Sequence, residues 1–301
     1  MSKEMPTPDV ALKDFFKDNQ IFADVFNGYF FNNEKVVKAD ELETDDTAYA
    51  ETIEVKGRKE KINKYRDNIR KTSFGYLVIL GIEDQSKIHY SMPVRKLLYD
   101  VLGYSAELAE KACTQDKSKW TIEERLSNVK KGTKITPIIT VVFYTGEEPW
   151  DGPRSLHDMM DMDERVKRFV PDYPLYVIDL GHDEDLFFQN EFLDGLKNIL
   201  SSIYSKNGDS NDTEVPNSLI ALAGILAGDK NLYLAVNEKG GSQKMCKALK
   251  ERDEQIFSEI NAKVAEKDAE IARLKADNAK IAEKDAEIAR LKAQLAAKTN
   301  E

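Results

Sequence analysis

The sequence predicts a mixed α/β fold that is followed by a helical region and a terminal coiled coil. Apolar, β-prone runs occur at 76–82, 135–144 and 174–180, and stretches with helical spacing separate them. Runs of this kind are typical of strands buried on both faces, and their alternation with helices favours one mixed sheet flanked by helices. Residues 186–250 have helical patterning, and a long repeat fills the rest of the chain. We therefore expect three parts, 1–185, 186–250 and 251–301.

The individual elements follow from the same patterns. Apolar residues spaced by three and four predict a helix with a wide aromatic face within 10–31. The strand at 76–82 (YLVILGI) leads to a helix over 92–102, for which Ser91 is a suitable N-cap and Pro93 fits the first turn. Residues 219–228 (LIALAGILAG) are apolar on almost every side, which predicts a buried helix too short to span a membrane.

Composition excludes several classes of protein. Hydrophobic residues make up 41% of the chain, with 13 Phe and 12 Tyr, which is enough for a packed core. Two cysteines rule out a disulfide framework and a four-thiolate zinc site, and the three histidines share no metal-ligand spacing. With no long apolar run and no secretory-type N-terminal segment, we expect a soluble, cytoplasmic protein without a membrane partner.

Charge is unevenly distributed along the chain. The formal net charge is −10, yet residues 56–71 carry eight basic groups against two acidic ones, directly after the acidic stretch 40–54. A basic strip on an acidic protein suits a polyanion that approaches at one place. A solvated hairpin with alternating charges explains the same pattern.

The C-terminal part contains a duplication. NAKVAEKDAEIARLKA at 261–276 returns as NAKIAEKDAEIARLKA at 278–293, an offset of two heptads plus three residues that acts as a stammer. Apolar residues at spacings of mostly three, four or seven form a stripe typical of a coiled coil. We therefore expect a homo-oligomer formed through 251–301, with a single charged helix as the alternative. The stripe comprises Ile260, Val264, Ile271, Leu274, Ile281, Ile288, Leu291 and Leu295.

Acidic side chains at the end of the strand at 76–82 form the candidate active site. Because strand residues alternate between faces, Glu83 and Gln85 point the same way. If 62–71 is the antiparallel partner, Asp67 can lie opposite Glu83. Two carboxylates beside a main-chain carbonyl suit Mg²⁺ (or Mn²⁺), which activates water for phosphodiester hydrolysis. A solvated strand end is the simpler interpretation.

Other side chains around this strand have expected roles in the same chemistry. Gln85 is placed to orient the attacking water. Basic residues near Asp67 are expected to bind the DNA backbone. These are Lys61, Lys64, Arg66, Arg70 and Lys71.

Several blocks of the sequence, in order, resemble one known family. The opening helix KDFFKDNQIFADVFNGYFF, the segment RDNIRK and the strand YLVILGIEDQS are followed by MPVRKLLYDVLGY and by TPIITVVFYTGEEPWDGPRSLHDM. Together these blocks, spanning roughly 12–182, resemble the recombination-promoting nuclease / putative transposase family of the PD-(D/E)xK nuclease superfamily. The last two blocks are the most specific to that family.

The resemblance implies a restriction-endonuclease-like fold and a metal-dependent DNA endonuclease. It makes Asp67 and Glu83 the metal ligands and places Gln85 where the superfamily consensus has lysine. Glutamine is neither a general base nor a positive charge, which puts the rate of the chemistry in question. Asp24 on the first helix is an additional candidate acid and Asp14 a second, although both also suit an ordinary helix surface.

Two functions are consistent with these features. The first is a Mg²⁺-dependent DNA endonuclease whose tail brings two catalytic domains together, because two sites cut both strands of a duplex most easily. The second is a catalytically weak or inactive nuclease-fold scaffold, multimerised by its coiled coil. The acidic body and the missing lysine favour the second function. The combination of Asp67, Glu83 and Gln85 with the basic strip favours the first.

Overall fold

The computed structural model describes residues 4–44, 49–55, 58–64, 68–73, 77–205, 214–236 and 240–298. Within these ranges the side chains of 49–55, 58–64, 73, 77–84 and 293–298 lie outside the description. The chain forms two compact units, Met1–Cys246 and Lys247–Glu301. The helical residues from 186 to 246 therefore belong to the same unit as residues 1–185.

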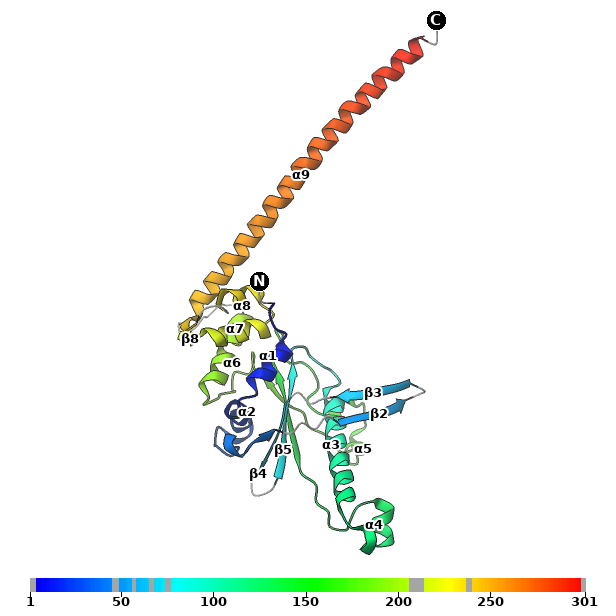
Figure 1. Cartoon of the computed structure of the whole chain (residues 1–301), viewed down its shortest axis with the longest axis vertical. Helices are drawn as coiled ribbons and strands as arrows, with labels where there is room; N and C mark the ends of the chain where they lie inside the picture. The colour runs from blue at the N-terminus through cyan, green and yellow to red at the C-terminus, as the bar shows by residue number, and fades with distance from the viewer. Residues whose placement is uncertain are drawn as a thin grey trace. The chain divides into compact units, whose positions relative to one another are not determined.

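A mixed five-stranded sheet lies at the centre of the first unit (Figure 1). The strand order is β1-β4-β5-β6-β7, in which β4 is antiparallel to β1 and β5 while β5, β6 and β7 run parallel. This confirms the predicted mixed sheet and all three predicted strands. The strands are β1 (Glu43–Thr44), β4 (Asn68–Ser73), β5 (Leu77–Gln85), β6 (Ile138–Tyr144) and β7 (Tyr176–Asp179).

The two faces of the sheet are covered by different helices. Alternate residues of β6 show this division, because successive side chains of a strand point to opposite faces. Phe143 packs edge-on against Phe16, at the end of helix α1 (Pro8–Phe15), with ring centroids 5.1 Å apart. Val142 and Tyr144 instead form a buried cluster with Met92, the first residue of helix α3 (Met92–Thr114). The N-terminal helices thus cover one face, and α3 covers the other.

The predicted single helix within 10–31 is two helices. Helix α1 ends at Phe15, and helix α2 runs from Asn19 to Phe31. Between them Asp18 adopts an extended conformation, and its carboxylate accepts a hydrogen bond from the Gln20 amide at 2.8 Å. Such a side chain competes with the helical backbone and begins a new helix, which is why helical periodicity alone did not locate the break.

The antiparallel partner of β5 is shorter than the predicted segment 62–71. It is β4, while residues 62–64 belong to a separate hairpin of β2 (Tyr49–Val55) and β3 (Arg58–Lys64). The hairpin lies beside α3 (Figure 1). It pairs the acidic stretch with the basic one, for example Glu54 with Lys59. This part of the strip therefore forms a hairpin, and the choice between a solvated surface and a polyanion contact stays open.

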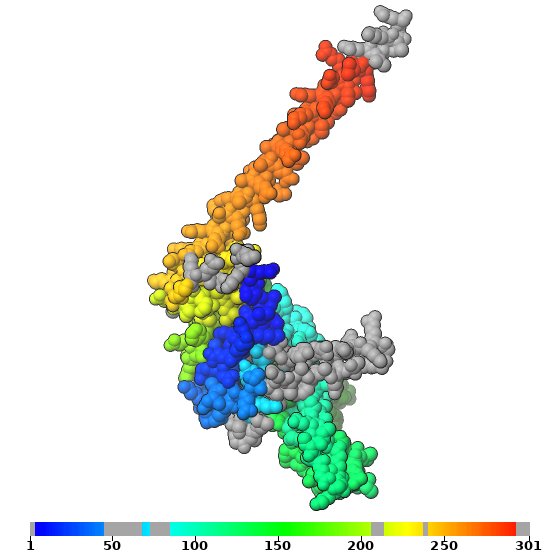
Figure 2. Space-filling model, viewed as in Figure 1, coloured from blue at the N-terminus to red at the C-terminus, as the bar shows by residue number. Residues whose placement is uncertain are grey.

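Helix α3 is longer than predicted and leads to a small helical tip. It continues to Thr114, and η2 (Lys117–Lys119) and α4 (Ile122–Ser127) follow before the chain returns to β6. Ser91 is the N-cap residue as expected, although its side chain makes no capping hydrogen bond. Figure 2 shows α4 and the end of α3, in green, standing clear of the rest of the first unit.

Three helices complete the first unit, as the patterning of 186–250 predicted. They are α6 (Glu191–Tyr204), α7 (Asn217–Leu226) and α8 (Lys230–Val236). Helix α7 is largely buried, contacts α1, α6 and α8, and contains the apolar segment at 219–228 as far as Leu226. A two-stranded sheet, β8 (Glu214–Pro216) with β9 (Ser242–Lys244), lies beside it, and the remaining short helices are η1 (Ala39–Glu41), η3 (His157–Met159) and α5 (Glu164–Lys167).

The C-terminal repeat folds as one continuous helix, α9 (Met245–Lys298), of 54 residues. The predicted helix is confirmed, whereas its pairing into a coiled coil stays a prediction. In this single chain the stripe is exposed to solvent as far as its side chains are described, with Ile271 at 47% and Leu274 at 57% exposure. Among the described residues, no helix combines the length and apolar character needed to cross a bilayer.

Candidate active site

The carboxyl ends of β5, β6 and β7 meet at one edge of the sheet. Gln85 ends β5, is half-buried, and is the register partner of Tyr144 at the end of β6. Its carbonyl accepts a hydrogen bond from the Thr145 amide at 2.9 Å, and the Leu180 amide after β7 donates to the Tyr144 carbonyl at 2.9 Å. These bonds hold the three strand ends together, as is usual for ligand sites in parallel sheets.

The two predicted metal ligands lie at the limit of what the structure describes. Glu83 is in β5, where its backbone is the register partner of Val142, and its side chain lies outside the description. Asp67 lies outside the described residues. The β4–β5 ladder reaches the pair Asn68 and Ile82. In the sequence Asp67 directly precedes Asn68, and Glu83 directly follows Ile82.

The expected DNA-binding residues fall into separate environments. Lys61 and Lys64 belong to β3 of the hairpin rather than to the central sheet. Lys71 is in β4, half-buried, and is the register partner of Glu43. Arg66 lies outside the described residues. The basic strip is therefore divided between two sheets.

Arg70 does not suit the expected contact with DNA. It is 6% exposed, and its guanidinium donates to Asn19 Oδ1 at 3.0 Å, to the Ile69 carbonyl at 2.9 Å and to the Phe16 carbonyl at 3.0 Å. The charge also lies over the Phe22 ring, 5.1 Å from its centroid. Arg70 thus joins β4 to the N-terminal helices from inside the protein, and sequence position alone did not reveal this.

Asp24 also has an architectural environment. Its Oδ2 accepts hydrogen bonds from Gln20 Nε2 and from Asn190 Nδ2, both at 2.8 Å. Asn190 is the N-cap of α6, so this carboxylate connects α2 to the start of α6. The structure thus gives Asp24 a role in joining these helices, and its expected role as an additional catalytic acid stays a prediction.

A second group at the strand ends was not anticipated from the sequence. His182 Nδ1 lies 2.8 Å from Asp179 Oδ1, and His182 Nε2 lies 3.0 Å from the Glu147 carbonyl. The other carboxylate oxygen of Asp179 accepts from the Trp150 amide at 2.8 Å. The spacing of three residues between Asp179 and His182 was the available signal. Because each ring nitrogen faces an acceptor, the imidazole fastens the turn after β6 to the end of β7.

Two tyrosines complete this edge. Tyr204 from α6 donates to the Thr145 carbonyl at 2.7 Å and stacks on His182 with ring centroids 5.5 Å apart. Tyr144 donates to the Glu148 carbonyl at 2.7 Å, and burial, followed by the charge of Asp179, raises its pKa to about 12. Burial likewise raises the pKa of Tyr204. Both phenols are therefore hydrogen-bond donors at neutral pH rather than acids or bases. Trp150 Nε1 donates to the Gly152 carbonyl at 2.9 Å, which fixes the turn after β6.

The donors available for a metal are oxygen atoms. Among the residues whose side chains are described, no group of three His, Cys, Asp or Glu comes together as a metal site. A site at the β4–β5 end would draw on carboxylates and main-chain carbonyls, which are the ligands that Mg²⁺ prefers. The chemistry of this donor set fits a hard divalent cation and not a thiolate-bound or imidazole-bound metal.

The fold and the strand ends define the class of the protein: a mixed α/β domain with an acidic side chain near the carboxyl end of a central strand and a long helical tail. The chain belongs to the family described as "Putative transposase, YhgA-like", whose model matches residues 8–221. Comparisons with curated proteins and with solved structures found no match. The matched segment covers the whole central sheet and continues to the middle of α7.

Proposed function

We propose that this protein is a metal-dependent DNA endonuclease. The observation that carries the proposal is the β4–β5 register, because the ladder leads to Asn68 and Ile82, the chain neighbours of Asp67 and Glu83. Membership in a transposase-like family supports DNA as the substrate. The restriction-endonuclease-like assignment of the fold is part of the same proposal.

The proposed work is divided among few residues. Asp67 and Glu83 supply carboxylate oxygens to a Mg²⁺ or Mn²⁺ ion, which when bound lowers the pKa of a water and neutralises phosphate charge. The Gln85 side-chain amide accepts a hydrogen bond from the attacking water and so directs it. Lys61, Lys64, Arg66 and Lys71 hold the DNA backbone, whereas Arg70 and Asp24 keep their structural roles.

The position of the hairpin supports the proposed backbone contacts. Glu83 and Gln85 are register partners of Val142 and Tyr144, two residues that pack with Met92 at the start of α3. The β2–β3 hairpin contacts the same helix. Strand alternation therefore favours an active site on the α3 side of the sheet, with the hairpin lysines beside it.

Plasmid cleavage tests the proposal directly. Wild-type protein, Glu83→Gln and Asp84→Asn are compared with Mg²⁺, with Mn²⁺ and with a chelator. Asp84 is the matched control, because strand alternation directs it to the opposite face while the charge change is identical. We expect metal-dependent cleavage that falls at least a hundredfold in Glu83→Gln and stays within a few-fold of wild type in Asp84→Asn. Cleavage that survives Glu83→Gln would place the chemistry elsewhere or in a contaminant.

Gln85 gives an independent check on the same site. Replacing Gln85 with lysine restores the residue of the superfamily consensus and adds a positive charge where phosphate charge develops. We expect Gln85→Lys to raise the cleavage rate several-fold. A Gln85→Lys protein that loses cleavage would show that the amide itself is required.

The second candidate function is a scaffold, and the exposed apolar stripe of α9 favours it. In this interpretation the nuclease-like domain is catalytically weak or inactive and is multimerised by its tail. Absence of cleavage with either metal on supercoiled, linear and single-stranded DNA would support the scaffold over the enzyme.

A further inference from the structure

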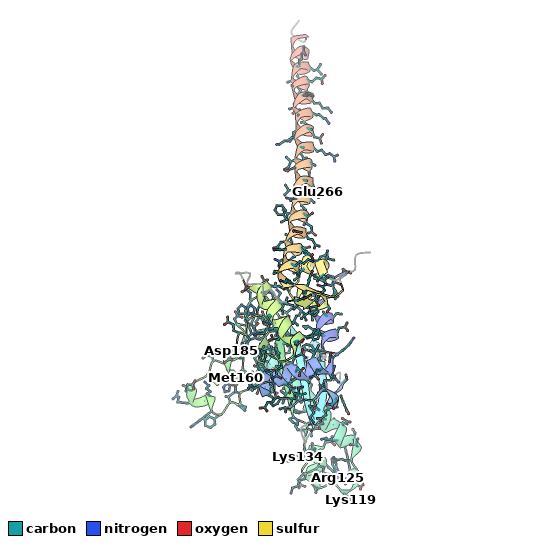
Figure 3. All side chains as sticks on the ribbon, turned by 90° about the vertical axis from the view of Figure 1, so that its left-hand side faces the viewer. Lys119, Arg125, Lys134, Met160, Asp185 and Glu266 are labelled. Atoms are coloured by element: carbon teal, nitrogen blue, oxygen red, sulfur yellow. The ribbon has the colours of Figure 1, made fainter. Side chains whose placement is uncertain are left out.

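The segment 111–134, from the last turn of α3 to just before β6, forms a basic tip with apolar side chains at its surface. It carries seven basic and three acidic residues on a chain whose net charge is −10. Figure 3 shows Lys119, Arg125 and Lys134 together at the far end of the first unit. This concentration of positive charge lies apart from the hairpin described above.

The tip is firmly folded in spite of its small size. Thr121 and Glu124 form a capping box at the start of α4, and Glu124 also accepts from the Lys131 amide at 2.9 Å. Glu107 anchors the returning chain by accepting from the Thr136 amide and hydroxyl, both at 2.8 Å. Burial alone would raise the pKa of Glu107, but the bonds from Lys111 and Thr136 outweigh it and lower the pKa. The tip is therefore a preformed surface.

The acids of the tip hold its backbone, while several of its lysines face solvent. The Asp116 carboxylate accepts a hydrogen bond from the Ser118 backbone amide at 2.9 Å, just as Glu124 accepts from backbone amides. The remaining ammonium groups are exposed and make no hydrogen bond or ion pair within the described part of the chain. They belong to Lys119, Lys130, Lys131 and Lys134.

Two apolar side chains lie among these lysines. Ile122 is 82% exposed and Leu126 is 88% exposed, the highest values among the large apolar side chains that the structure describes. They are four residues apart on α4 and therefore lie on one side of the helix. Exposed apolar side chains flanked by basic groups are the arrangement that minor-groove proteins use to wedge between base pairs while lysines hold the phosphates.

We propose that the α4 tip is a second contact with duplex DNA, in which the four lysines bind phosphates and Ile122 and Leu126 enter the minor groove. This inference rests on the proposed endonuclease function, because that function identifies the polyanion as DNA. Charge complementarity supports it, because the tip is a local positive region on an acidic protein. The tip thus extends the DNA-binding surface beyond the site at the strand ends.

Helix α3 sets the distance between the two contacts. It begins at Met92, which packs with Tyr144, the register partner of Gln85, and it ends within the tip at Thr114. Its 23 residues span about 34 Å at about 1.5 Å per residue. One turn of B-DNA is also about 34 Å long, so a duplex that reaches both contacts needs about ten base pairs between them.

Binding to labelled duplexes without a catalytic metal tests the tip separately from cleavage. Fluorescence anisotropy is measured with duplexes of about 24 and about 8 base pairs, which span about 80 and about 27 Å. The test variant replaces Lys119, Lys130, Lys131 and Lys134 with alanine. A matched control replaces four other exposed lysines, Lys35, Lys230, Lys247 and Lys250.

We expect the tip variant to bind the long duplex at least tenfold more weakly than wild type. Its plot of log affinity against log salt is expected to lose about 3.6 units of slope, since each of the four phosphate contacts contributes about 0.9. On the short duplex, which cannot reach both contacts at once, the difference between tip variant and wild type should be smaller. Replacing the same four lysines with arginine should preserve binding, and the control variant should resemble wild type on both duplexes.

The apolar wedge is tested by Ile122→Ala combined with Leu126→Ala. This change keeps all charges, so the salt slope is expected to remain while the bend of an end-labelled duplex, measured by energy transfer, decreases. Far-ultraviolet circular dichroism confirms that both variants fold.

Several results would overturn the tip proposal. The first is equal affinity of wild type and tip variant for the long duplex. The second is a loss of affinity in the control lysine variant as large as that in the tip variant. The third is a wild-type protein that does not bind the duplex. Tip-dependent binding to phosphatidylserine vesicles with unchanged duplex affinity would assign the tip to membranes instead. Tip-dependent duplex binding without Glu83-dependent cleavage would keep this inference and reject the endonuclease. Glu83-dependent cleavage together with a tip variant that binds the long duplex as tightly as wild type would keep the endonuclease and reject this inference.

Discussion

A buried ion pair on α3 shows how strongly single residues constrain this fold. Lys96 and Asp100 are 4% and 0% exposed, and the Lys96 Nζ lies 3.0 Å from Asp100 Oδ2. Asp100 also accepts bonds from Tyr173 and, at 3.3 Å, from Thr140 of β6. The Lys96 ammonium lies 4.2 Å from the centroid of the Tyr173 ring. The group thus joins α3, β6 and the segment before β7.

We predict that Lys96→Met destabilises the protein by about 3–5 kcal/mol, because it leaves the Asp100 carboxylate buried without its cation. Urea unfolding followed by circular dichroism measures the change. The double variant Lys96→Met with Asp100→Leu removes both charges and should be more stable than the single variant. A loss below about 1 kcal/mol in the single variant would contradict the buried-pair account.

Tyr144 and Tyr204 predict the alkaline behaviour of the protein. A phenol in the unfolded chain ionises near pH 10, whereas burial holds the pKa of Tyr144 at about 12 and also raises that of Tyr204. Between these values the unfolded state releases protons that the folded state retains, so stability is fully present below about pH 10 and falls as the pH rises toward 12.

Phenolate absorbance measures this effect. We expect Tyr144 and Tyr204 to ionise late or only on unfolding, and Tyr144→Phe to remove one late phenol. The same variant should show a weaker loss of stability with rising pH. Titration of every tyrosine below pH 11 would contradict the burial of these two groups.

At the scale of elements, hydrophobic patterning predicted secondary structure most reliably where one uninterrupted apolar run corresponds to one strand or helix. The apolar runs became β5, β6 and β7, and the apolar segment at 219–228 became the buried helix α7 as far as Leu226. Boundaries were less predictable, because Asp18 and the tip after α3 depend on particular side-chain-to-backbone bonds. Residues 62–64, expected beside the strand at 76–82, became part of a hairpin strand instead, since strand pairing is decided between distant segments.

The stripe of α9 leads to a prediction about association. An exposed apolar stripe on a long helix favours pairing with a second copy of the same helix. We predict that Ile271→Lys with Leu274→Lys converts an oligomer into a monomer, measured by analytical ultracentrifugation. Ala272→Lys with Ala276→Lys adds the same charge on the other side of the helix and should leave the oligomer intact. A wild-type chain that sediments as a monomer would contradict this association.

For the whole molecule, association through α9 is expected to change the DNA product of cleavage. If two catalytic domains act together, the monomeric variant is expected to nick supercoiled plasmid, while wild type produces linear DNA from breaks in both strands. The ratio of nicked to linear product, measured at equal total cleavage, reports this difference. An unchanged ratio in the monomeric variant would show that each domain cuts independently of the tail.

The sequence by itself determined the mixed sheet, the strand bearing Glu83, the helical tail and the resemblance to the transposase-like family. Each of these depends on residue patterns within one segment or on several segments in a set order. Only the tertiary structure decided that Arg70 and Asp24 serve the architecture, that Asp179 meets His182, and that Lys96 and Asp100 are buried together. The physical reason is that a local pattern specifies the periodicity and faces of an element. Burial and hydrogen-bond partners depend instead on which distant segments pack against it.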